Sequence, residues 1–248
     1  MPGTNENKAK IIVIAHIFYD DGWDVIYPLL KELKQFEIKL LVNICDVNRK
    51  KQELRNQRKN AFADAIVIAT PNVGKDIGGK LALMELAIQL KIKADYYIFL
   101  HDKKSPHTTL GDRWREKLFR IIQKESASQI HTLFLKNKKV GMVGMKGMIT
   151  NEYNIKTQDF NSNNSTILKE LITEYKIEIS NYDFIGGTMF WVRTESFNTF
   201  FSKYSPLEIR ATLEQGNVLD YTQGTVTHAW ERVLSFIITN EKYELRGI

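Results

Sequence analysis

The first half of the chain alternates short apolar runs with segments of helical character. Each apolar run is rich in branched or aromatic residues and is bounded by polar groups, which is typical of a strand buried on both faces inside a parallel sheet. The segments between the runs carry apolar residues at helical spacing or strong helix formers. The pattern predicts strands over residues 10–16, 38–44, 65–69 and 96–100 and helices over residues 23–36, 47–62 and 80–89. This order predicts an α/β fold with a mostly parallel central sheet, right-handed crossovers and flanking helices.

The second half does not continue that alternation. Its pattern predicts helices over 114–135, 166–175 and 227–239, a short strand over 140–143, an asparagine-rich loop over 151–165 and a strand over 184–192. The last of these strands contains the paired glycines Gly186 and Gly187. Paired glycines inside a strand indicate either a bulge or a place where a ligand or another backbone comes close.

Composition limits the class of protein. A chain of 248 residues with 43% hydrophobic content can bury the core of one large α/β domain or two small ones. We assign residues 1–9 to a flexible N-terminus and residues 10–248 to one domain. The single cysteine, Cys45, excludes an internal disulfide and a multi-cysteine zinc site. No apolar stretch approaches the roughly 20 residues of a membrane span and no signal peptide opens the chain, so we expect a cytosolic protein.

The chain is basic, with a formal net charge of +6. Such a balance suits nucleic acid, an anionic membrane face or a phosphorylated substrate. A basic cluster occupies residues 49–59, on a polar segment whose charges are best explained by a solvated helix face. No interleaved aromatic residues or nucleic-acid motif accompany it, so we expect no nucleic-acid partner.

The apolar run 96–100 stops at four polar residues, His101, Asp102, Lys103 and Lys104. In open α/β sheets, ligands bind just beyond the carboxyl ends of such strands. Histidine and aspartate can hold a divalent cation, and lysine suits an anionic, phosphate-bearing ligand. The alternative is a solvated turn that happens to be charged.

A glycine-containing turn over residues 71–79 is the second candidate site. It is neither a Walker loop, because no Gly-Lys-Ser/Thr ends it, nor a dinucleotide fingerprint, which needs its glycines right after the first strand. A turn that opens a helix still presents free backbone amides to an anion. Asp76, near the predicted helix start, has two interpretations: an N-cap, or a contact with a base, a ribose or a lysine.

A third group, His228, Glu231 and Arg232, lies on one face of the last predicted helix. Glu231 is a candidate general base. The alternative is a structural ion pair between Glu231 and Arg232.

Several segments taken together resemble one family. They are Asn72-x-Gly74-x-Asp76-Ile77-Gly78, His101-x-Lys103-Lys104-Ser105-x-His107, Gly111-x-x-Trp114-Arg115, Gly187-Thr188-Met189-Phe190-Trp191 and His228-Ala229-x-Glu231-Arg232. Over residues 11–234 the chain resembles the rhamnan synthesis protein F family, bacterial proteins of cell-wall rhamnan and lipopolysaccharide O-antigen assembly that are regarded as glycosyltransferases. The layout is also similar to that of GT-A nucleotide-sugar transferases, in which the corresponding strand ends in a metal-binding Asp-x-Asp. Here the motif is reduced to His101-Asp102-Lys103, and the family usually has threonine where this chain has Asp102.

The resemblance implies a single GT-A-like (Rossmann-like) domain with a nucleotide-sugar half over residues 10–110 and an acceptor half over 111–248. It implies transfer of a sugar, with rhamnose suggested by the family name, from a nucleotide-sugar donor to a polysaccharide or lipid-linked glycan. Peripheral contact with the inner membrane face would bring the enzyme to its acceptor. A second hypothesis, supported by the reduced acidic motif, is a non-catalytic sugar- or nucleotide-binding module of a polysaccharide assembly complex.

The resemblance also implies roles for individual residues. The implied donor-binding residues are Asn72, Asp76, His101, Asp102, Lys103, Lys104 and Arg115. A divalent cation, Mn²⁺ or Mg²⁺, is implied at His101 and Asp102, and the basic residues would stabilise the departing diphosphate with or without it. The implied acceptor or structural residues are Gly186, Gly187, Thr188, Trp191 and His228. Glu231 is the implied catalytic base, and Asp183 is the next candidate.

Overall fold

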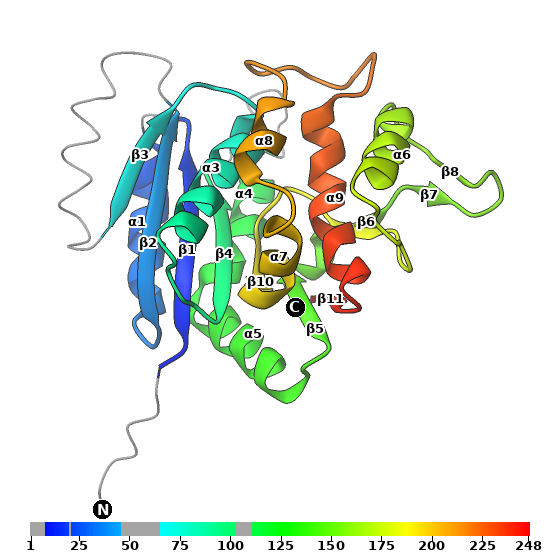
Figure 1. Cartoon of the computed structure of the whole chain (residues 1–248). Helices are drawn as coiled ribbons and strands as arrows, with labels where there is room; N and C mark the ends of the chain where they lie inside the picture. Colours follow the sequence, from blue (N-terminus) through cyan, green and yellow to red (C-terminus); the bar gives the residue numbers. More distant parts are fainter. Residues whose placement is uncertain (1–7, 20, 46–64, 103–110) are drawn as a thin grey trace, which may run out of the picture.

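The predicted α/β architecture is confirmed by a computed structural model, which describes residues 8–19, 21–45, 65–102 and 111–248. Over these residues the structure has a central seven-stranded sheet in the order β11-β5-β10-β4-β1-β2-β3 (Figure 1). Its strands are β1 (Lys10–Ile17), β2 (Glu37–Cys45), β3 (Ile66–Thr70), β4 (Tyr96–His101), β5 (Val140–Gly144), β10 (Phe190–Arg193) and β11 (Glu244–Gly247). Strands β3, β2, β1 and β4 are parallel neighbours, whereas β10 runs antiparallel to both β4 and β5. The sheet is therefore mostly parallel with one reversed strand.

Helices cover both faces of the sheet (Figure 1). They are α1 (Gly22–Leu30), α3 (Lys75–Gln89), α4 (Gly111–Phe119), α5 (Lys124–Lys136), α6 (Ser165–Glu174), α7 (Thr194–Phe201), α8 (Pro206–Ala211) and α9 (Val226–Asn240), with the 3₁₀ turns η1 (Lys31–Leu33), η2 (Arg120–Ile122) and η3 (Lys146–Met148). Alternate side chains of the central strands meet different helices, as the period of a strand requires. Phe99 and Phe190 pack on Phe197 of α7, whereas Tyr96 stacks on Phe134 of α5. The aromatic residues thus pack both helical layers onto the sheet.

The structure corrects three element predictions. The helix predicted over 23–36 ends at Leu30 and continues only as η1, and the helix predicted over 114–135 is divided into α4, η2 and α5. The strand predicted over 184–192 is two strands: β9 (Asp183–Ile185) pairs with β6 (Ile149–Asn151) outside the main sheet, and β10 lies in it. The asparagine-rich loop contains a further short ribbon, β7 (Tyr153–Asn154) with β8 (Asp159–Phe160). The helix predicted over 47–62 lies outside the described residues.

Helix α3 begins five residues earlier than the pattern predicts, so Gly78 and Gly79 lie inside the helix rather than before it. Its N-cap is Gly74, in the left-handed conformation with φ +69°, so the N-cap interpretation of Asp76 is wrong. A Cβ on Gly79 would lie 2.0 Å from Nδ1 of His16 in β1. The absence of a side chain at Gly79 therefore lets α3 lie close to the sheet, and this brings the next residue, Lys80, over the strand ends.

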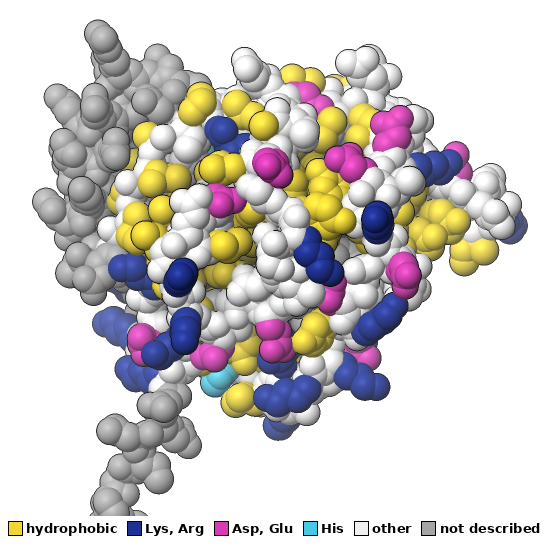
Figure 2. Space-filling model, in the orientation of Figure 1, with side chains coloured by type: hydrophobic (Ala, Val, Ile, Leu, Met, Phe, Trp, Pro, Cys, Tyr) yellow, Lys and Arg dark blue, Asp and Glu magenta, His cyan; other side chains and the backbone are white. Residues whose placement is uncertain are grey.

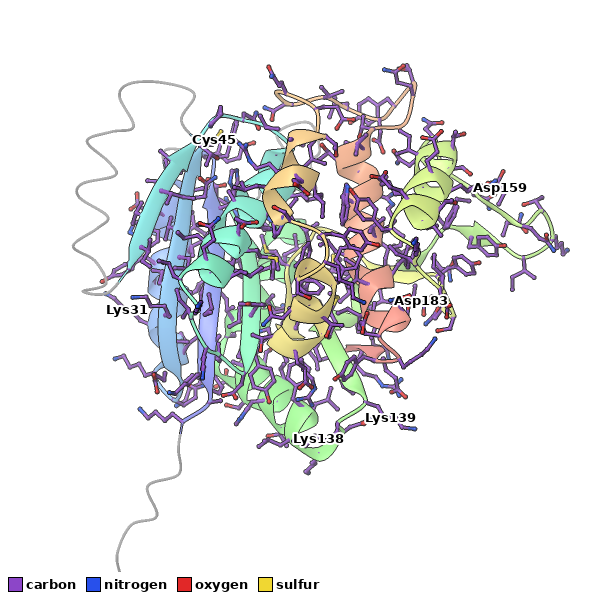
Figure 3. The ribbon with its side chains drawn as sticks, viewed as in Figure 1. Lys31, Cys45, Lys138, Lys139, Asp159 and Asp183 are labelled. Atoms are coloured by element: carbon purple, nitrogen blue, oxygen red, sulfur yellow. The ribbon has the colours of Figure 1, made fainter. Side chains whose placement is uncertain are left out.

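The described surface is mixed in charge. Figure 2 shows lysine and arginine side chains spread over one face of the molecule with acidic side chains among them. Cys45 is buried at the end of β2 (Figure 3). None of the described helices is long and apolar enough to cross a membrane.

Candidate functional site

A buried lysine ties three elements together at the carboxyl edge of the parallel strands. Nζ of Lys80, in α3, lies 2.8 Å from Oδ2 of Asp76 on the same helix and 3.0 Å from Nδ1 of His101 at the end of β4. It also lies 2.8 Å from both the carbonyl oxygen and Oγ1 of Thr188, which follows β9. Thr188 Oγ1 in turn donates a hydrogen bond of 2.5 Å to Asp76 Oδ2. We call Asp76, Lys80, His101 and Thr188 the lysine cluster.

The centre of the lysine cluster is closed to solvent. The side chain of Lys80 is 1% exposed and that of Asp76 is 22% exposed. Burying an ammonium is costly without partners, and Nζ of Lys80, which has three donors and no acceptor, has acceptor oxygens on Asp76 and Thr188 within hydrogen-bond distance. Burial alone would raise the pKa of Asp76, but electrostatic interactions with His101 and Lys80, together with hydrogen bonds from Lys80 and Thr188, hold this pKa well below its usual value. Asp76 is therefore a carboxylate at neutral pH.

Asp102, the next residue after β4, serves a different part of the molecule. Its carboxylate accepts hydrogen bonds from the backbone amides of Phe18, at 2.8 and 2.9 Å, and Tyr19, at 2.5 Å, in the loop that joins β1 to α1. Gly22 packs against it so closely that a Cβ there would lie 2.0 Å from Oδ2 of Asp102. Asp102 thus holds the β1–α1 loop at the carboxyl edge of the sheet, a role that the sequence did not indicate.

His101 and Asp102, the predicted ligands of a divalent cation, are not arranged to bind one ion together. Successive residues of a strand point to opposite faces. His101 accordingly directs Nδ1 to Lys80, whereas Asp102 directs its carboxylate to backbone amides of the β1–α1 loop. Within the described part of the chain, no group of three or more His, Cys, Asp or Glu side chains is placed to hold a metal ion.

A second buried cation, Arg232 of α9, organises a pair of carboxylates. Its guanidinium binds Glu152 through two bonds, with Nη2 2.5 Å from Oε1 and Nε 3.1 Å from Oε2. Nη1 lies 2.7 Å from Oε2 of Glu231 and 2.9 Å from the carbonyl oxygen of His228. Burial alone would lower the pKa of Arg232, but the hydrogen bonds to Glu152 and the charges of Glu231 and Glu152 raise it. We call Glu152, Glu231 and Arg232 the arginine cluster.

The two clusters meet at the turn between β9 and β10. The amide of Gly187 donates a 2.6 Å hydrogen bond to Oε1 of Glu231, and the next residue, Thr188, binds Lys80. Both turn residues have positive φ angles, +80° for Gly187 and +49° for Thr188. Glycine adopts this conformation freely, but in a β-branched threonine it costs about 1–3 kcal/mol. The bonds from the two clusters offset that cost, so the turn couples them.

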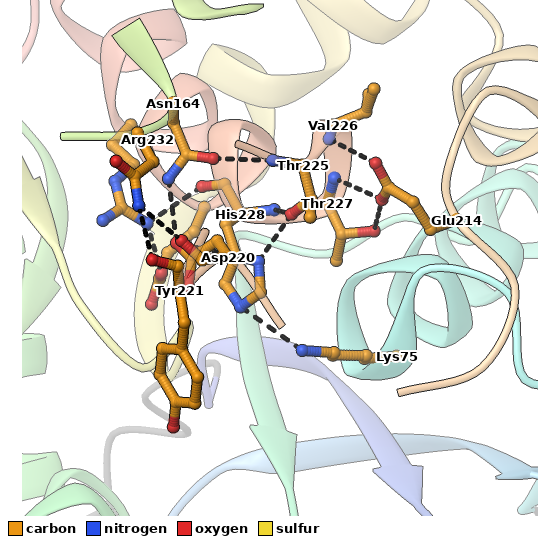
Figure 4. Close-up of polar contacts among 12 residues, drawn as sticks. Lys75, Asn164, Glu214, Asp220, Tyr221, Thr225, Val226, Thr227, His228 and Arg232 are labelled. Carbon is orange, nitrogen blue, oxygen red and sulfur yellow. Dashed lines mark hydrogen bonds and ion pairs between the residues drawn. The ribbon is translucent and has the colours of Figure 1, made fainter. Parts of the chain in front are cut away.

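His228 lies on the first turn of α9 and joins that helix to α3 (Figure 4). Its Nε2 lies 3.3 Å from Nζ of Lys75, and its Nδ1 lies 2.5 Å from Oγ1 of Thr225, the N-cap residue. Burial, and next the charge of Lys75, lower the pKa of His228, although Asp220 acts in the opposite direction. His228 is therefore mainly neutral at pH 7.

The predicted donor residue Asn72 holds the segment between α8 and α9 in place. Its side-chain amide donates to Oδ1 of Asn217 at 3.0 Å, and its carbonyl oxygen accepts from the amide of Gly216 at 2.8 Å. The same segment caps α9, because Glu214 accepts hydrogen bonds from the amides of Val226 and Thr227 (Figure 4). Asn72 therefore contributes to the frame of the site through this segment.

Two of the predicted site residues lie away from the clusters. Trp191 is fully buried in β10, where its indole donates to the carbonyl oxygen of Ile121 at 2.9 Å. Asp183 opens β9, which runs along α9 in the opposite direction, since Gly187 meets Glu231 and Ile185 meets Ser235 further along the helix. Asp183 consequently lies beside the C-terminal half of α9 (Figure 3), bonded to Asn151 and Asn181 rather than near Glu231.

The remaining predicted residues frame the turn or lie outside the described residues. The amide of Gly186 donates to the carbonyl oxygen of Met148 at 2.8 Å. Arg115 is half-buried on α4, one turn before Leu118, and Leu118 is the side chain that a Cβ on Gly187 would contact at 2.9 Å. Because residues three apart share a helix face, Arg115 lies on the face of α4 that meets the turn. Lys103 and Lys104 lie outside the described residues.

Three charged residues of the site were missed from the sequence. Lys80 could have been found from its spacing of four from Asp76 and its place among strong helix formers, because Asp and Lys at this spacing meet on a helix. Lys75 lies within the turn predicted over residues 71–79, where a lysine is ordinary. Glu152 lies in the asparagine-rich segment and carries no signal, because its partner Arg232 is 80 residues away.

A mostly parallel sheet with one reversed strand, flanked by helices and with a polar cluster at its carboxyl edge, defines an α/β protein whose candidate site lies where open sheets bind ligands. The chain matches the model of the family described as rhamnan synthesis protein F over residues 2–243, and it belongs to that family. Rhamnan is a polysaccharide, so membership assigns the chain to polysaccharide biosynthesis.

Among solved structures, the chain is similar to the mannosyltransferase PcManGT from Pyrobaculum calidifontis, determined in complex with GDP-Man and Mn²⁺. The TM-score is 0.45 and the sequence identity 12%, and the alignment covers 98% of this chain and 55% of that one. None of the curated proteins matches the chain.

Proposed function

We propose that the protein is a glycosyltransferase that moves a sugar, rhamnose in the first instance, from a nucleotide-sugar donor to a glycan or lipid-linked acceptor. Membership of a rhamnan synthesis family supports the substrate class. The observation that carries the proposal is the convergence of Asp76, His101, Thr188 and Glu231 from four different elements at the carboxyl edge of the parallel strands. That edge is where open α/β sheets bind their ligands.

On the donor side, we assign the binding of the nucleotide sugar to Asp76, with Arg115 and the predicted Lys103 and Lys104 at the diphosphate. The bonds that Asp76 makes within the lysine cluster all go to Oδ2, so Oδ1 is the oxygen that would accept a hydrogen bond from a donor hydroxyl. Changing Lys103 or Lys104 to alanine should weaken donor binding by about 1–3 kcal/mol, the range for a hydrogen bond to a charged group. Unchanged affinity in both variants would assign these lysines to the solvated surface.

On the acceptor side, we assign Glu231 as the base for an inverting transfer. The carboxylate would take the proton of the acceptor hydroxyl while the acceptor oxygen bonds to the anomeric carbon. The bond from that carbon to the diphosphate oxygen breaks, and the diphosphate leaves with the electron pair. The amide of Gly187 and the guanidinium of Arg232 each donate a hydrogen bond to Glu231, and these two bonds orient its carboxylate.

We also propose that transfer takes place at the inner face of the membrane, where a lipid-linked acceptor would lie. The net charge of +6 favours a peripheral contact with an anionic leaflet. Sedimentation with vesicles of phosphatidylglycerol and phosphatidylcholine tests this. Binding that disappears at high salt supports an electrostatic contact, and no binding to anionic vesicles at low salt contradicts it.

The proposed function is tested by calorimetry with UDP-, GDP- and dTDP-sugars, followed by an assay of donor hydrolysis and transfer. Binding together with slow hydrolysis of one donor supports the enzyme. Asp76→Asn should weaken that binding, and the matched control is Asp24→Asn, an exposed aspartate of α1. Failure of every donor to bind would contradict the proposal.

A binding module without catalysis is the second candidate. It is favoured by one observation: both oxygens of Glu231 already have partners, which is what a structural ion pair needs. This hypothesis predicts donor binding with no hydrolysis and no transfer, so the same assay separates the two functions.

A further inference from the structure

We propose that Lys80 is the permanent cation of the donor site, and that donor binding at this site needs no divalent metal ion. The proposal deepens the proposed function, on which it rests, because it concerns how the same site would handle charge.

Four polar atoms surround Nζ of Lys80, much as ligands surround a metal ion. One carboxylate oxygen, one imidazole nitrogen, one hydroxyl and one carbonyl oxygen lie within 2.8–3.0 Å of it, from Asp76, His101 and Thr188. Oxygen and imidazole donors of this kind also suit divalent cations. The distances, however, are those of hydrogen bonds, whereas Mg²⁺ binds its ligands at about 2.0–2.1 Å. The acceptors are spaced for an ammonium.

This cation cannot exchange with solvent. Lys80 is 1% exposed and belongs to α3, whose glycine at position 79 packs within van der Waals distance of the sheet. A metal ion entering the cluster would meet a like charge and acceptors already in use. The other carboxylate at this strand end, Asp102, is directed to the amides of Phe18 and Tyr19. Asp76 and Asp102 therefore direct their carboxylates to different partners and do not form a pair around one metal ion.

Lys80 acts through Asp76 rather than on the donor. The ammonium, the Thr188 hydroxyl and the His101 ring all approach Oδ2 of Asp76, at 2.8, 2.5 and 3.4 Å. This arrangement fixes the plane of the carboxylate and leaves Oδ1, on a side chain that is 22% exposed, to face a ligand. Lys80 is thus a positioning residue, and its charge is supplied by the fold.

The first test uses the full chain and needs no variant. Binding of UDP, GDP and dTDP is measured by calorimetry in EDTA and again in Mn²⁺. We expect the nucleotide that binds to do so with the same affinity in both buffers. Binding that is lost in EDTA and restored by Mn²⁺ would overturn the proposal. If no nucleotide binds in either buffer, the proposed function fails, and the inference that rests on it fails too; this result differs from a metal-dependent one.

The second test separates a positioning role from a merely structural one. Lys80→Ala removes the ammonium and leaves its acceptors in place, so we expect nucleotide binding about tenfold weaker in EDTA and recovered when Mn²⁺ supplies the charge. The matched control is Lys124→Ala, an exposed lysine of α5, which should bind as the wild type in both buffers. A folded Lys80→Ala protein with wild-type affinity in EDTA, or one with the same weak affinity in both buffers, would overturn the positioning role. If Lys80→Ala does not fold, Lys80→Met with Asp76→Asn removes both charges together, and wild-type nucleotide affinity in that folded protein would overturn it equally.

Discussion

The lysine cluster and the arginine cluster each place a cation beside a carboxylate, but they distribute its bonds differently. Lys80 offers a compact ammonium whose contacts come from three elements, and those that reach Asp76 end on a single oxygen. Arg232 offers a planar fork that binds Glu152 through two atoms and Glu231 through a third. A point charge concentrates its effect on one group, whereas a guanidinium shares it between groups held in a fixed geometry.

The two clusters therefore hold their carboxylates in different ways. In the lysine cluster the bonds to Asp76 converge on Oδ2, and we propose that its other oxygen, Oδ1, binds the ligand. The arginine cluster holds Glu231 from one side while the amide of Gly187 holds it from the other. Because Gly187 and Thr188 are consecutive, neither carboxylate can move without the turn, and the two halves of the site are coupled.

The largest expected effect is on catalysis in the arginine cluster. Glu231→Gln keeps the shape of the side chain but removes its ability to take a proton. Transfer should slow by about 10²–10⁴-fold with donor affinity nearly intact, the usual contribution of a positioned base. Steady-state kinetics and calorimetry on the same preparation check this, with Glu170→Gln, an exposed glutamate of α6, as control. Full transfer activity in a stably folded Glu231→Gln protein would show that Glu231 is not the base and that it only forms the ion pair with Arg232.

The next effect is on stability, and it should differ between the clusters. Lys80→Met strips Asp76 of a buried partner and should lower the free energy of unfolding by about 3–5 kcal/mol, the range for breaking a buried ion pair. Arg232→Met should cost less, about 2 kcal/mol, because the side chain of Arg232 is 10% exposed whereas that of Lys80 is 1% exposed, so the Arg232 ion pairs are better reached by water. Urea denaturation measures both values. The reverse order would show that the shared guanidinium is the more important of the two cations.

A smaller effect is expected for donor binding at the lysine cluster. Asp76→Asn keeps a hydrogen-bonding group but removes the charge that Lys80 orients, so donor affinity should fall by about 1–3 kcal/mol. Asp24→Asn should leave it unchanged. Affinity is measured by calorimetry. Equal affinity in Asp76→Asn and the wild type would show that Asp76 does not bind the donor and serves only as the partner of Lys80.

The smallest effect is a dependence of stability on pH that tells the clusters apart. The pKa of His228 is lowered in the folded state, so the unfolded chain binds more protons below its usual value of 6.5, and stability falls as the pH drops through that range. The pKa of Asp76 is held well below 3.8, so its contribution is present above that value and is lost only in more acidic solution. The free energy of unfolding of His228→Gln should therefore depend less on pH than that of the wild type between about pH 5 and 6.5. That of Asp76→Asn should depend less on pH below about pH 4. Denaturation midpoints across pH test this, and a single shared window for both variants would contradict it.

The sequence predicted which side chains lie at the carboxyl edge of the sheet better than it predicted their partners. His101 could be predicted because it ends an apolar run, and the carboxyl end of a parallel strand is where sites form. The partner of Asp102 could not be predicted, because the loop that it binds lies 83–84 residues earlier in the chain. Asp76 is a partner of Lys80 rather than a helix cap, because α3 begins at Lys75 and its N-cap is the left-handed Gly74.

The sequence by itself determined the parallel half of the sheet. Strands buried on both faces must be apolar throughout, so β1, β4 and most of β2 are visible as apolar runs without any knowledge of their neighbours, and the half-buried edge strand β3 is visible as a short run of branched residues. The tertiary structure alone decided what the charged residues do. Lys80 and Thr188 are 108 residues apart, and Arg232 and Glu152 are 80 apart, so no local pattern records either contact. It also decided that residues 184–192 form two strands rather than one, because Gly187 and Thr188 adopt positive φ angles where the two clusters bind them. Local periodicity reports which residues are buried, whereas the pairing of buried charges depends on which distant elements the fold brings together.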